Sequence, residues 1–257
     1  MNIQISDPAE GIRQITLARP PANALSPDLL AELNEALDAA VKEGTRTVVI
    51  AGQPGMFSAG LDVPLLLGLN REEMARFWGS FFDLLARIAR SPIPVGFAIT
   101  GHCPAGGTVL SLYGDYRIAA AGDFKLGLNE VQVGLPMPPL IFHAFRRLVG
   151  AHNAEQLGVA GQLVSPQKAL EIGLVDSVVP PEEVVQNAIE HGRKLASLPP
   201  QALAATRELA RADLAALFDD LQRESTAALN EIWFAEETQA AMRALIARIA
   251  DKGKARE

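Results

Sequence analysis

The sequence predicts an α/β fold with largely parallel strands, followed by a helical C-terminal region. Short apolar runs at 47–51, 93–100 and 115–120 indicate buried strands, and amphipathic segments of helical period separate them. Strands that alternate with helices in this way are typical of parallel pairing. Residues 201–250 contain no strand-like alternation and are rich in alanine, leucine and arginine, which predicts helices alone.

The first elements carry clear boundary signals. Residues 12–18 alternate apolar and polar side chains, as a half-buried strand does. A helix is expected to begin at Ser26, because a proline and an acid follow this capping residue. Asn70 with Glu73 forms a capping box for a second helix that runs to about Arg90. The apolar face of the first helix comprises Leu29, Leu30, Leu33, Leu37, Ala40 and Val41.

The second half of the chain begins with a glycine-rich turn. This turn, GHCPAGG at 101–107, is expected to lead into a short buried helix at 108–114. Two further helices are expected to begin at Ser165 and at Pro180, each with a proline in the first turn. The stretch SLPP at 197–200 then predicts a linker.

This linker divides the chain into a core over residues 1–197 and a helical region over residues 198–257. The helical region is expected to hold two or three helices. Its apolar stripes need cover from the core or from another subunit, so we expect the region to support oligomerisation. The stripes comprise Leu203, Leu209, Leu214, Leu217, Phe218 and Leu221.

Composition narrows the class of protein. Hydrophobic residues make up 49% of the 257 residues and charged residues 21%, which suits a chain with a sizeable core. The net charge of −7 disfavours nucleic acid or an anionic membrane as the main partner. A single cysteine, Cys103, leaves no internal disulfide and suits a reducing compartment. With no signal-peptide pattern and no apolar run of about 20 residues, we expect a soluble, cytoplasmic protein.

Two glycine-containing loops, FSAGLD at 57–62 and CPAGGT at 103–108, each follow a predicted strand. Glycines let the backbone pass close to a ligand, and free N–H groups at the start of a helix bind negative charge. One N–H group from each loop could therefore converge on one oxygen and form an oxyanion hole. Tight strand–helix turns are the alternative interpretation.

Glu130 is the clearest candidate for proton transfer. It is flanked by Leu128, Val131 and Val133, and an apolar setting raises the pKa of a carboxyl group. The alternative is a glutamate on a solvent-exposed face. Asn129 would support the acid or serve as a turn residue.

His102 and Cys103 are adjacent on a predicted strand, so their side chains point to opposite faces and do not suggest a nucleophile–base pair. The sequence shows no metal-ligand spacing and no glycine-rich nucleotide fingerprint.

Several motifs in order resemble the enoyl-CoA hydratase/isomerase (crotonase) superfamily. They are FSAGLD, PIPVGFAITGHCPAGG, GDYRIA and GLNEVQVGLP, and the resemblance extends from RPPANAL through ALEIGLVDSVVP to the helical C-terminus. CPAGG, DYRI and GLNE are most similar to the mitochondrial-type Δ3,Δ2-enoyl-CoA isomerase branch. The resemblance implies the crotonase fold, with ββα units repeated along a spiral, and homotrimers that often pair into hexamers.

The resemblance also implies roles for the two loops. One oxyanion-hole N–H group falls on Leu61 and the other on Gly106, and together they would hold the thioester oxygen of an acyl-CoA. Coenzyme A would lie along the first loop, with RPPANAL nearby, and beside the glycine-rich turn. The implied substrate-binding residues are Ser58, Ala59, Gly60, Leu61, Asp62, Ala105 and Gly107.

The acids distinguish the reactions of this superfamily. Hydratases carry two glutamates; here Val109 stands at the first position and Glu130 at the second. Adding water takes an acid and a base, whereas shifting a double bond from C3 to C2 takes one carboxylate. The resemblance therefore implies a 3-enoyl-CoA isomerase of fatty-acid β-oxidation, with Glu130 and Asn129 as catalytic residues. It implies no metal or redox cofactor, because coenzyme A is part of the substrate.

Alternatives within the superfamily are hydration, decarboxylation or thioester hydrolysis, and outside catalysis a CoA-ester binder. Residues 63–80 fall where the family varies most and are expected to line the acyl tunnel. Leu65–Leu67 and Phe77 could lie there or in the core. Arg207 falls where many relatives carry a lysine near the CoA phosphate; a solvated arginine on a helix face is the alternative.

Overall fold

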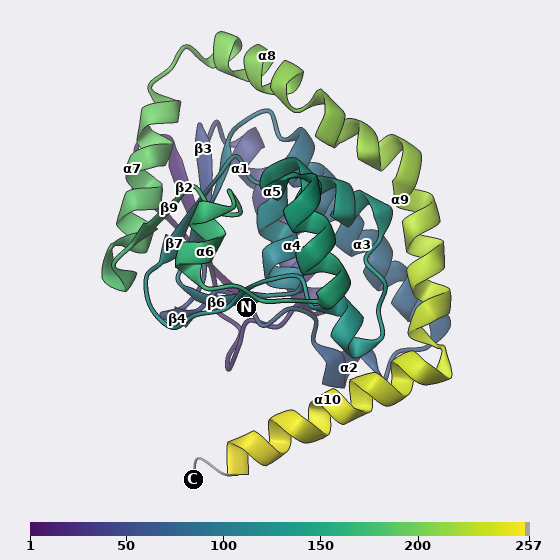
Figure 1. Cartoon of the computed structure of the whole chain (residues 1–257). Helices are drawn as coiled ribbons and strands as arrows, with labels where there is room; N and C mark the ends of the chain where they lie inside the picture. Colours follow the sequence, from purple (N-terminus) through teal and green to yellow (C-terminus); the bar gives the residue numbers. More distant parts are fainter. Residues whose placement is uncertain (255–257) are drawn as a thin grey trace.

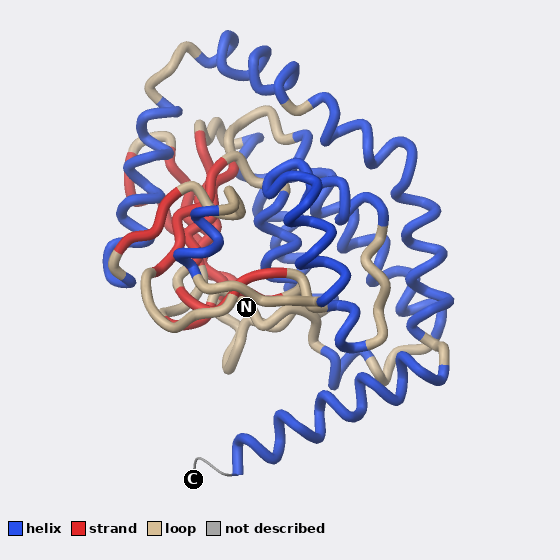
Figure 2. Tube along the Cα trace, viewed as in Figure 1, coloured by secondary structure: helices blue, strands red, loops and turns tan. Residues whose placement is uncertain are grey.

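The main sheet of the computed structural model, which describes residues 1–254, holds six strands in the order β1-β2-β3-β5-β7-β9 (Figures 1 and 2). β1 and β2 pair antiparallel, and all other neighbours pair parallel. A second, smaller sheet is parallel, in the order β4-β6-β8. The strands are β1 (Ile3–Ala9), β2 (Ile12–Leu17), β3 (Thr47–Ala51), β4 (Gly55–Met56), β5 (Val95–Ile99), β6 (Gly101–Pro104), β7 (Tyr116–Ala120), β8 (Leu126–Gly127) and β9 (Ser177–Val179).

Helices cover both faces of the main sheet. The face towards α7 carries a small apolar cluster that includes Ile12, Val49 and Ile118. The opposite face carries the large core, in which α1, α3, α4 and α5 pack. The helices are α1 (Pro27–Lys42), α2 (Val63–Leu66), α3 (Arg71–Arg90), α4 (Gly106–Leu112), α5 (Pro139–Ala160), α6 (Pro166–Glu171), α7 (Val184–Ala196), α8 (Pro200–Ala210), α9 (Ala212–Trp233) and α10 (Glu236–Lys254), with 3₁₀ turns η1 (Glu130–Val133) and η2 (Pro181–Glu183).

The expected repeat of ββα units is confirmed. Three neighbouring strands of the main sheet, β3, β5 and β7, are each followed by a short strand of the second sheet and then by a helix or helical turn. Because these strands are parallel, the segments that follow them leave the same edge of the sheet. Open parallel sheets bind ligands at this edge, beyond the carboxyl ends of the strands.

The boundary signals at two helices are confirmed by their caps. Ser26 Oγ accepts a hydrogen bond from the Leu29 N–H at 3.3 Å. Asn70 Oδ1 accepts from the Glu73 N–H at 3.0 Å, and Glu73 Oε2 accepts from the Asn70 N–H at 2.8 Å, which completes the capping box. The predicted apolar face of α1 is wrong at one residue. Val41 lies in the last turn of the helix and is 40% exposed.

Three helices, α8, α9 and α10, follow the linker and form an arc around the outer side of the molecule (Figure 1). Leu214 and Phe218 of α9 are buried in the large core, and α9 packs along α3. The chain therefore covers much of this stripe itself, although Leu209 stays 79% exposed. The role of residues 198–257 in trimers or hexamers stays a prediction. Among the described residues, no helix combines the length and hydropathy that a bilayer crossing requires.

Candidate functional site

A cavity of about 910 Å³ opens where the segments after β3, β5 and β7 meet. We call it the Glu130 cavity. The fold explains why distant motifs share it, because the carboxyl ends of three adjacent parallel strands deliver them to one edge. Predicted site residues that line it are Ala59, Leu61, Asp62, Ala105, Gly106, Asn129 and Glu130.

Three predicted substrate-binding residues lie behind this lining. Ser58 is fully buried, and its hydroxyl donates to the Asn23 carbonyl at 2.8 Å and accepts from the Gly60 N–H at 3.2 Å. A Cβ on Gly107 would lie 2.8 Å from the Ser58 carbonyl oxygen, so only glycine fits there. Ser58, Gly60 and Gly107 thus shape the loops rather than face the cavity.

The two glycine loops touch through their backbones. A Cβ on Gly60 would lie 3.2 Å from the Gly106 nitrogen, and a Cβ on Gly106 would lie 3.3 Å from the Gly60 Cα. Leu25 and Leu61 form an isolated parallel β-bridge. In it the Leu25 N–H donates to the Gly60 carbonyl and the Asp62 N–H donates to the Leu25 carbonyl, so the Leu61 N–H takes no part. Gly106 is the first residue of α4, where an N–H group has no intrahelical partner. Two free N–H groups are thereby brought to one place, and such a pair can hold an oxyanion.

The turn before α4 is held in a strained conformation. Ala105 adopts φ 48° and ψ −124°, and a positive φ of this kind is unfavourable for every residue except glycine. Its N–H group donates to the Gly127 carbonyl at 2.8 Å. Thr108 Oγ1 donates to the Cys103 carbonyl and accepts from the Gly127 N–H at 2.9 Å. These bonds tie the turn to the segment that leads to Glu130.

Glu130 opens the 3₁₀ turn η1 at the edge of the cavity. Its Oε2 is buried and has no hydrogen-bond partner among the described residues. Burial raises the pKa of the Glu130 carboxyl from 4.5 to about 7. The buried Val109 side chain lines the same cavity from α4. The carboxyl is thus suited to take up and release a proton near neutral pH.

Asn129 precedes Glu130 and also lines the cavity. Its Oδ1 is buried without a hydrogen-bond partner in the part of the chain that the structure describes. Two neighbouring side chains with unpaired polar atoms face one cavity, which marks this wall as the polar part of the site.

His102 and Cys103 do not form a nucleophile–base pair. His102 lines the mouth of the cavity, and its Nδ1 accepts from the Lys125 N–H at 3.2 Å. Cys103 is fully buried away from the cavity, and burial raises the pKa of its thiol to about 12. Such a thiol stays protonated and unreactive at neutral pH.

Several cavity residues carried no clear sequence signal. Arg19 pairs with Asp62 at the mouth and also donates to the Ala24 carbonyl at 3.1 Å, so it fixes loop 19–25 against loop 57–62. Apolar residues of α3, η1, α9 and α10 also line the cavity. They include Trp78, Phe81, Val133, Leu229, Met242, Leu245 and Ile246.

Of residues 63–80, which the sequence predicts to line the acyl tunnel, Val63, Pro64 and Trp78 line the cavity. For Leu66 and Phe77 the core alternative is the one observed, Leu65 is 39% exposed, and none of these lines the cavity. From α3, Trp78 and, just beyond the expected range, Phe81 line the cavity. An apolar helix segment predicts burial but does not tell which apolar residue borders a cavity.

The solvated interpretation of Arg207 is wrong, and its place near the coenzyme A phosphate stays a prediction. Arg207 is only 7% exposed, so it is not a solvated residue, and it does not line the Glu130 cavity. Its Nε and Nη2 donate to the Asp115 carboxylate at 2.8 and 2.9 Å. It also donates to the Ile88 carbonyl at 3.1 Å and thereby helps to cap the C-terminus of α3.

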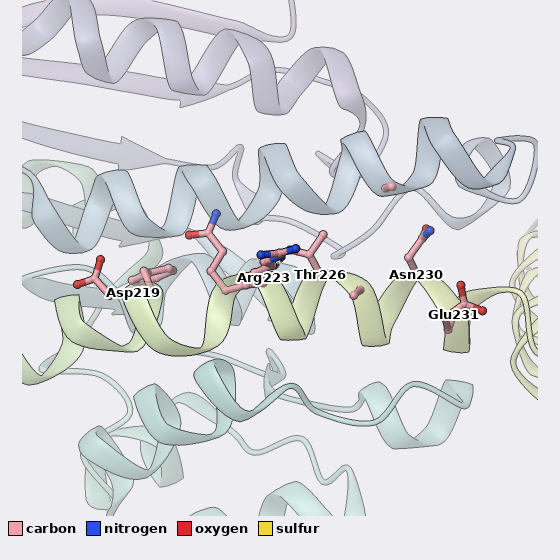
Figure 3. Close-up of a pocket in the computed structure, with 9 residues that line it drawn as sticks. Asp219, Arg223, Thr226, Asn230 and Glu231 are labelled. Carbon is pink, nitrogen blue, oxygen red and sulfur yellow. Dashed lines mark hydrogen bonds between the residues drawn. The ribbon is translucent and has the colours of Figure 1, made fainter.

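A second hollow, of about 670 Å³, lies along α9 beside α3 (Figure 3). Side chains of Asp219, Arg223, Thr226, Asn230 and Glu231 rise from α9 along it. The hollow shares no lining residue with the Glu130 cavity. It has neither free backbone N–H groups at a helix start nor a buried acid, so the chemistry belongs to the Glu130 cavity.

Comparisons with known proteins agree with this geometry. Residues 7–250 match the family model described as enoyl-CoA hydratase/isomerase. The human protein "Enoyl-CoA delta isomerase 1, mitochondrial" is 33% identical over 80% of this chain and 69% of its own. "Probable enoyl-CoA hydratase echA17" of Mycobacterium avium is 32% identical over 89% and 88%.

Solved structures extend the likeness to the fold. Human mitochondrial delta3-delta2-enoyl-CoA isomerase superimposes with a TM-score of 0.93 at 28% identity, covering 98% of this chain and 99% of its own. An enoyl-CoA hydratase (ECHA3) from Mycobacterium marinum gives 0.82 at 28% identity, covering 89% and 100%. The chain therefore has the crotonase fold and belongs to the enoyl-CoA hydratase/isomerase family of acyl-CoA enzymes.

Proposed function

We propose that this enzyme is a Δ3,Δ2-enoyl-CoA isomerase, with Glu130 as its only acid–base group. The observation that carries the proposal is the pairing of one buried, unpartnered carboxylate with an apolar Val109 in the same cavity. Asp62 also lines this cavity, but it binds Arg19 and accepts from the Leu65 N–H at 3.2 Å. Glu130 is therefore the lining carboxylate with an oxygen free for substrate.

The reaction needs one proton to leave C2 and one to arrive at C4. The thioester acidifies C2, and ionised Glu130 takes that proton, which leaves a dienolate with C1–C2 and C3–C4 double bonds. The double bond moves to C2–C3, and the thioester carbonyl re-forms, when C4 is protonated. The dienolate oxygen that forms is stabilised by the N–H groups of Leu61 and Gly106. Protonated Glu130 then returns the proton to C4, so atoms and charge balance. Asn129 supports the carboxyl group, and coenzyme A is carried in by the substrate.

Hydration is the reaction to separate from isomerisation, because relatives at similar identity include named hydratases. We would follow the conjugated-enoyl thioester absorbance with trans-3-hexenoyl-CoA and, in parallel, with crotonyl-CoA. Growth with the first substrate and little loss with the second is the expected result. Rapid loss with crotonyl-CoA would mean that water adds without an acid at Val109, and the proposal would fail.

The pH dependence of catalysis follows from the Glu130 carboxyl. Only the ionised form can remove a proton, and its pKa is raised to about 7 by burial. We expect kcat/KM for a 3-enoyl-CoA to rise about tenfold per pH unit below pH 7 and to level off above it. A profile already flat from pH 5 to 8 would contradict this role for Glu130.

Substitution Gly60→Ala tests the contact between the two loops. Gly60 has φ 89°, and a Cβ there would lie 3.0 Å from the Ala105 Cβ, so the Leu61 and Gly106 N–H groups must move apart. Losing one oxyanion donor typically lowers kcat about 10²–10³-fold, and we expect a loss of this size in steady-state assays. Gly79→Ala is the matched control, because a Cβ on this glycine of α3 meets nothing within 4 Å. Unchanged kcat in Gly60→Ala would rule out this placement of the oxyanion site.

A further inference from the structure

The Glu130 cavity has a clear direction, from an open mouth to a buried end. Pro20, Ala59 and Lys125 at the mouth are exposed. Trp78 and Leu229 at the other end are 2% and 4% exposed.

Helix α10 shows the same gradient along one wall of the cavity. Met242 is 1% exposed, Leu245 and Ile246 are half-buried, and Ile249 is 61% exposed. The start of α10 is fixed at the deep end, where Thr238 Oγ1 donates to the Gly134 carbonyl at 2.9 Å. The wall therefore runs from the buried end to solvent.

Trp78 closes the deep end. Trp233 of α9 packs behind it, with ring centroids 6.0 Å apart at 76°, and Trp233 is fully buried and does not line the cavity. Phe77 also packs against the Trp78 ring, with ring centroids 5.3 Å apart at 65°. A ligand chain that reaches Trp78 thus meets a packed aromatic cluster rather than open space.

The chemistry of the deep end selects a hydrocarbon. The charged side chains that line the cavity are Arg19, Asp62, Lys125 and Glu130, and they lie at the mouth or at the reacting centre. Around Trp78 the lining is aliphatic or aromatic, with Phe81, Leu229 and Met242. A charged group at the end of an acyl chain would lose its hydration there without gaining a partner.

The indole of Trp78 acts here through its size. A buried tryptophan N–H usually finds a partner, yet Trp78 Nε1 has none among the described residues. Replacing Trp78 therefore removes volume without leaving a protein acceptor unpaired.

We propose that Trp78 forms the blind end of the acyl site and sets the longest unfunctionalised hydrocarbon chain that the enzyme accepts. This proposal rests on the proposed function only in taking an acyl-CoA as the ligand. Replacing the indole by the smaller leucine side chain opens space at the blind end. Trp78→Leu should thus admit chains a few carbons longer.

The experiment measures the affinity of saturated acyl-CoAs from four to sixteen carbons by calorimetry, so that it needs no turnover. For the wild type we expect affinity to rise about three- to fourfold per methylene up to a limiting length and then to level off or fall. In Trp78→Leu the limiting chain length should move to longer chains, because the smaller side chain frees volume at the blind end. Leu229→Phe, which fills the same end, should move it to shorter chains.

Phe77→Leu is the matched control. Phe77 is as buried as Trp78 and packs against it, but it does not line the cavity, so its loss should leave the limiting length unchanged. A hexanoyl-CoA with a terminal carboxylate should bind at least tenfold more weakly than hexanoyl-CoA itself.

The outcomes separate this proposal from the proposed function. If the limiting chain length is the same in the wild type, Trp78→Leu and Leu229→Phe, Trp78 does not set it, even if isomerisation is observed. A limit that moves in opposite directions in the two variants, without isomerase turnover, would uphold Trp78 and reject the isomerase. If Trp78→Leu does not fold, the comparison of Leu229→Phe with the wild type still tests the proposal. A limiting chain length that is no shorter in Leu229→Phe would mean that the acyl chain ends elsewhere.

Discussion

Glu130→Gln is expected to lower kcat for a 3-enoyl-CoA by about 10³–10⁴-fold and to leave the affinity for the product nearly unchanged. General acid–base catalysis typically contributes 10²–10⁴-fold, and here one group performs both the removal and the return of the proton. Glutamine keeps the shape of the side chain but cannot carry a proton between C2 and C4. Steady-state kinetics and product affinity of the purified variant measure the two effects separately.

The stability of the same variant provides an independent check. The folded-state pKa of about 7 lies above the ordinary value of 4.5, so the folded protein binds more protons than the unfolded chain between these pH values. Stability therefore falls as pH rises through this window, and the loss above pH 7 amounts to about 3 kcal/mol. Glu130→Gln removes this penalty, and its melting temperature should exceed that of the wild type at pH 8 but not at pH 4.

Glu155→Gln controls for the change of charge, because Glu155 is exposed on α5 and does not line the cavity. It should change neither kcat nor the pH dependence of stability. If Glu130→Gln kept kcat within tenfold of the wild type, another base would be at work and the single-carboxylate mechanism would be wrong. If it lost activity without gaining stability at pH 8, the carboxyl would not be desolvated in the free enzyme.

Local signals account for the parts of the fold that could be predicted. The caps at Ser26 and Asn70 depend on residues three positions away, and both are visible in the sequence. β1 has no such signal, because most of its side chains are exposed and it gains its place by pairing with β2. Part of the expected turn at 101–107 is in fact strand β6, which is held by β4 and β8 from distant parts of the chain.

The site also contains residues that local sequence signals predict and residues that only the folded structure brings in. Glu130 and Gly106 stand in motifs that the sequence shows, and the structure places both on one cavity. The α10 wall was missed, because its apolar residues could equally have covered a core or a subunit interface. Trp78 lies within the range expected to line the tunnel, but it could not be singled out there, because helical periodicity does not distinguish a side chain at a cavity from its neighbour Phe77, which does not line it. Which apolar surfaces meet is set by tertiary packing, over separations that periodicity does not sense.

Arg207→Met is expected to lower the free energy of unfolding by about 3–5 kcal/mol, the usual cost of breaking a buried ion pair. Arg207 binds both oxygens of Asp115, 92 residues earlier in the sequence, and joins α8 to the end of α3 through the Ile88 carbonyl. Methionine replaces the length of the side chain but leaves Asp115, whose side chain is 14% exposed, with Arg211 at 3.6 Å as its remaining cation. Chemical denaturation followed by circular dichroism measures the loss.

Arg207→Lys and a double variant separate charge from geometry. Lysine keeps the charge but cannot donate two parallel bonds to Asp115, so it should recover only part of the lost stability. Arg207→Met combined with Asp115→Asn should cost less than the sum of the two single changes, because the unpaired carboxylate is gone. KM for acyl-CoA substrates should stay within about twofold of the wild type in Arg207→Lys, since Arg207 is not on the Glu130 cavity. A large rise in KM with the stability unchanged would instead place Arg207 at the coenzyme A phosphate.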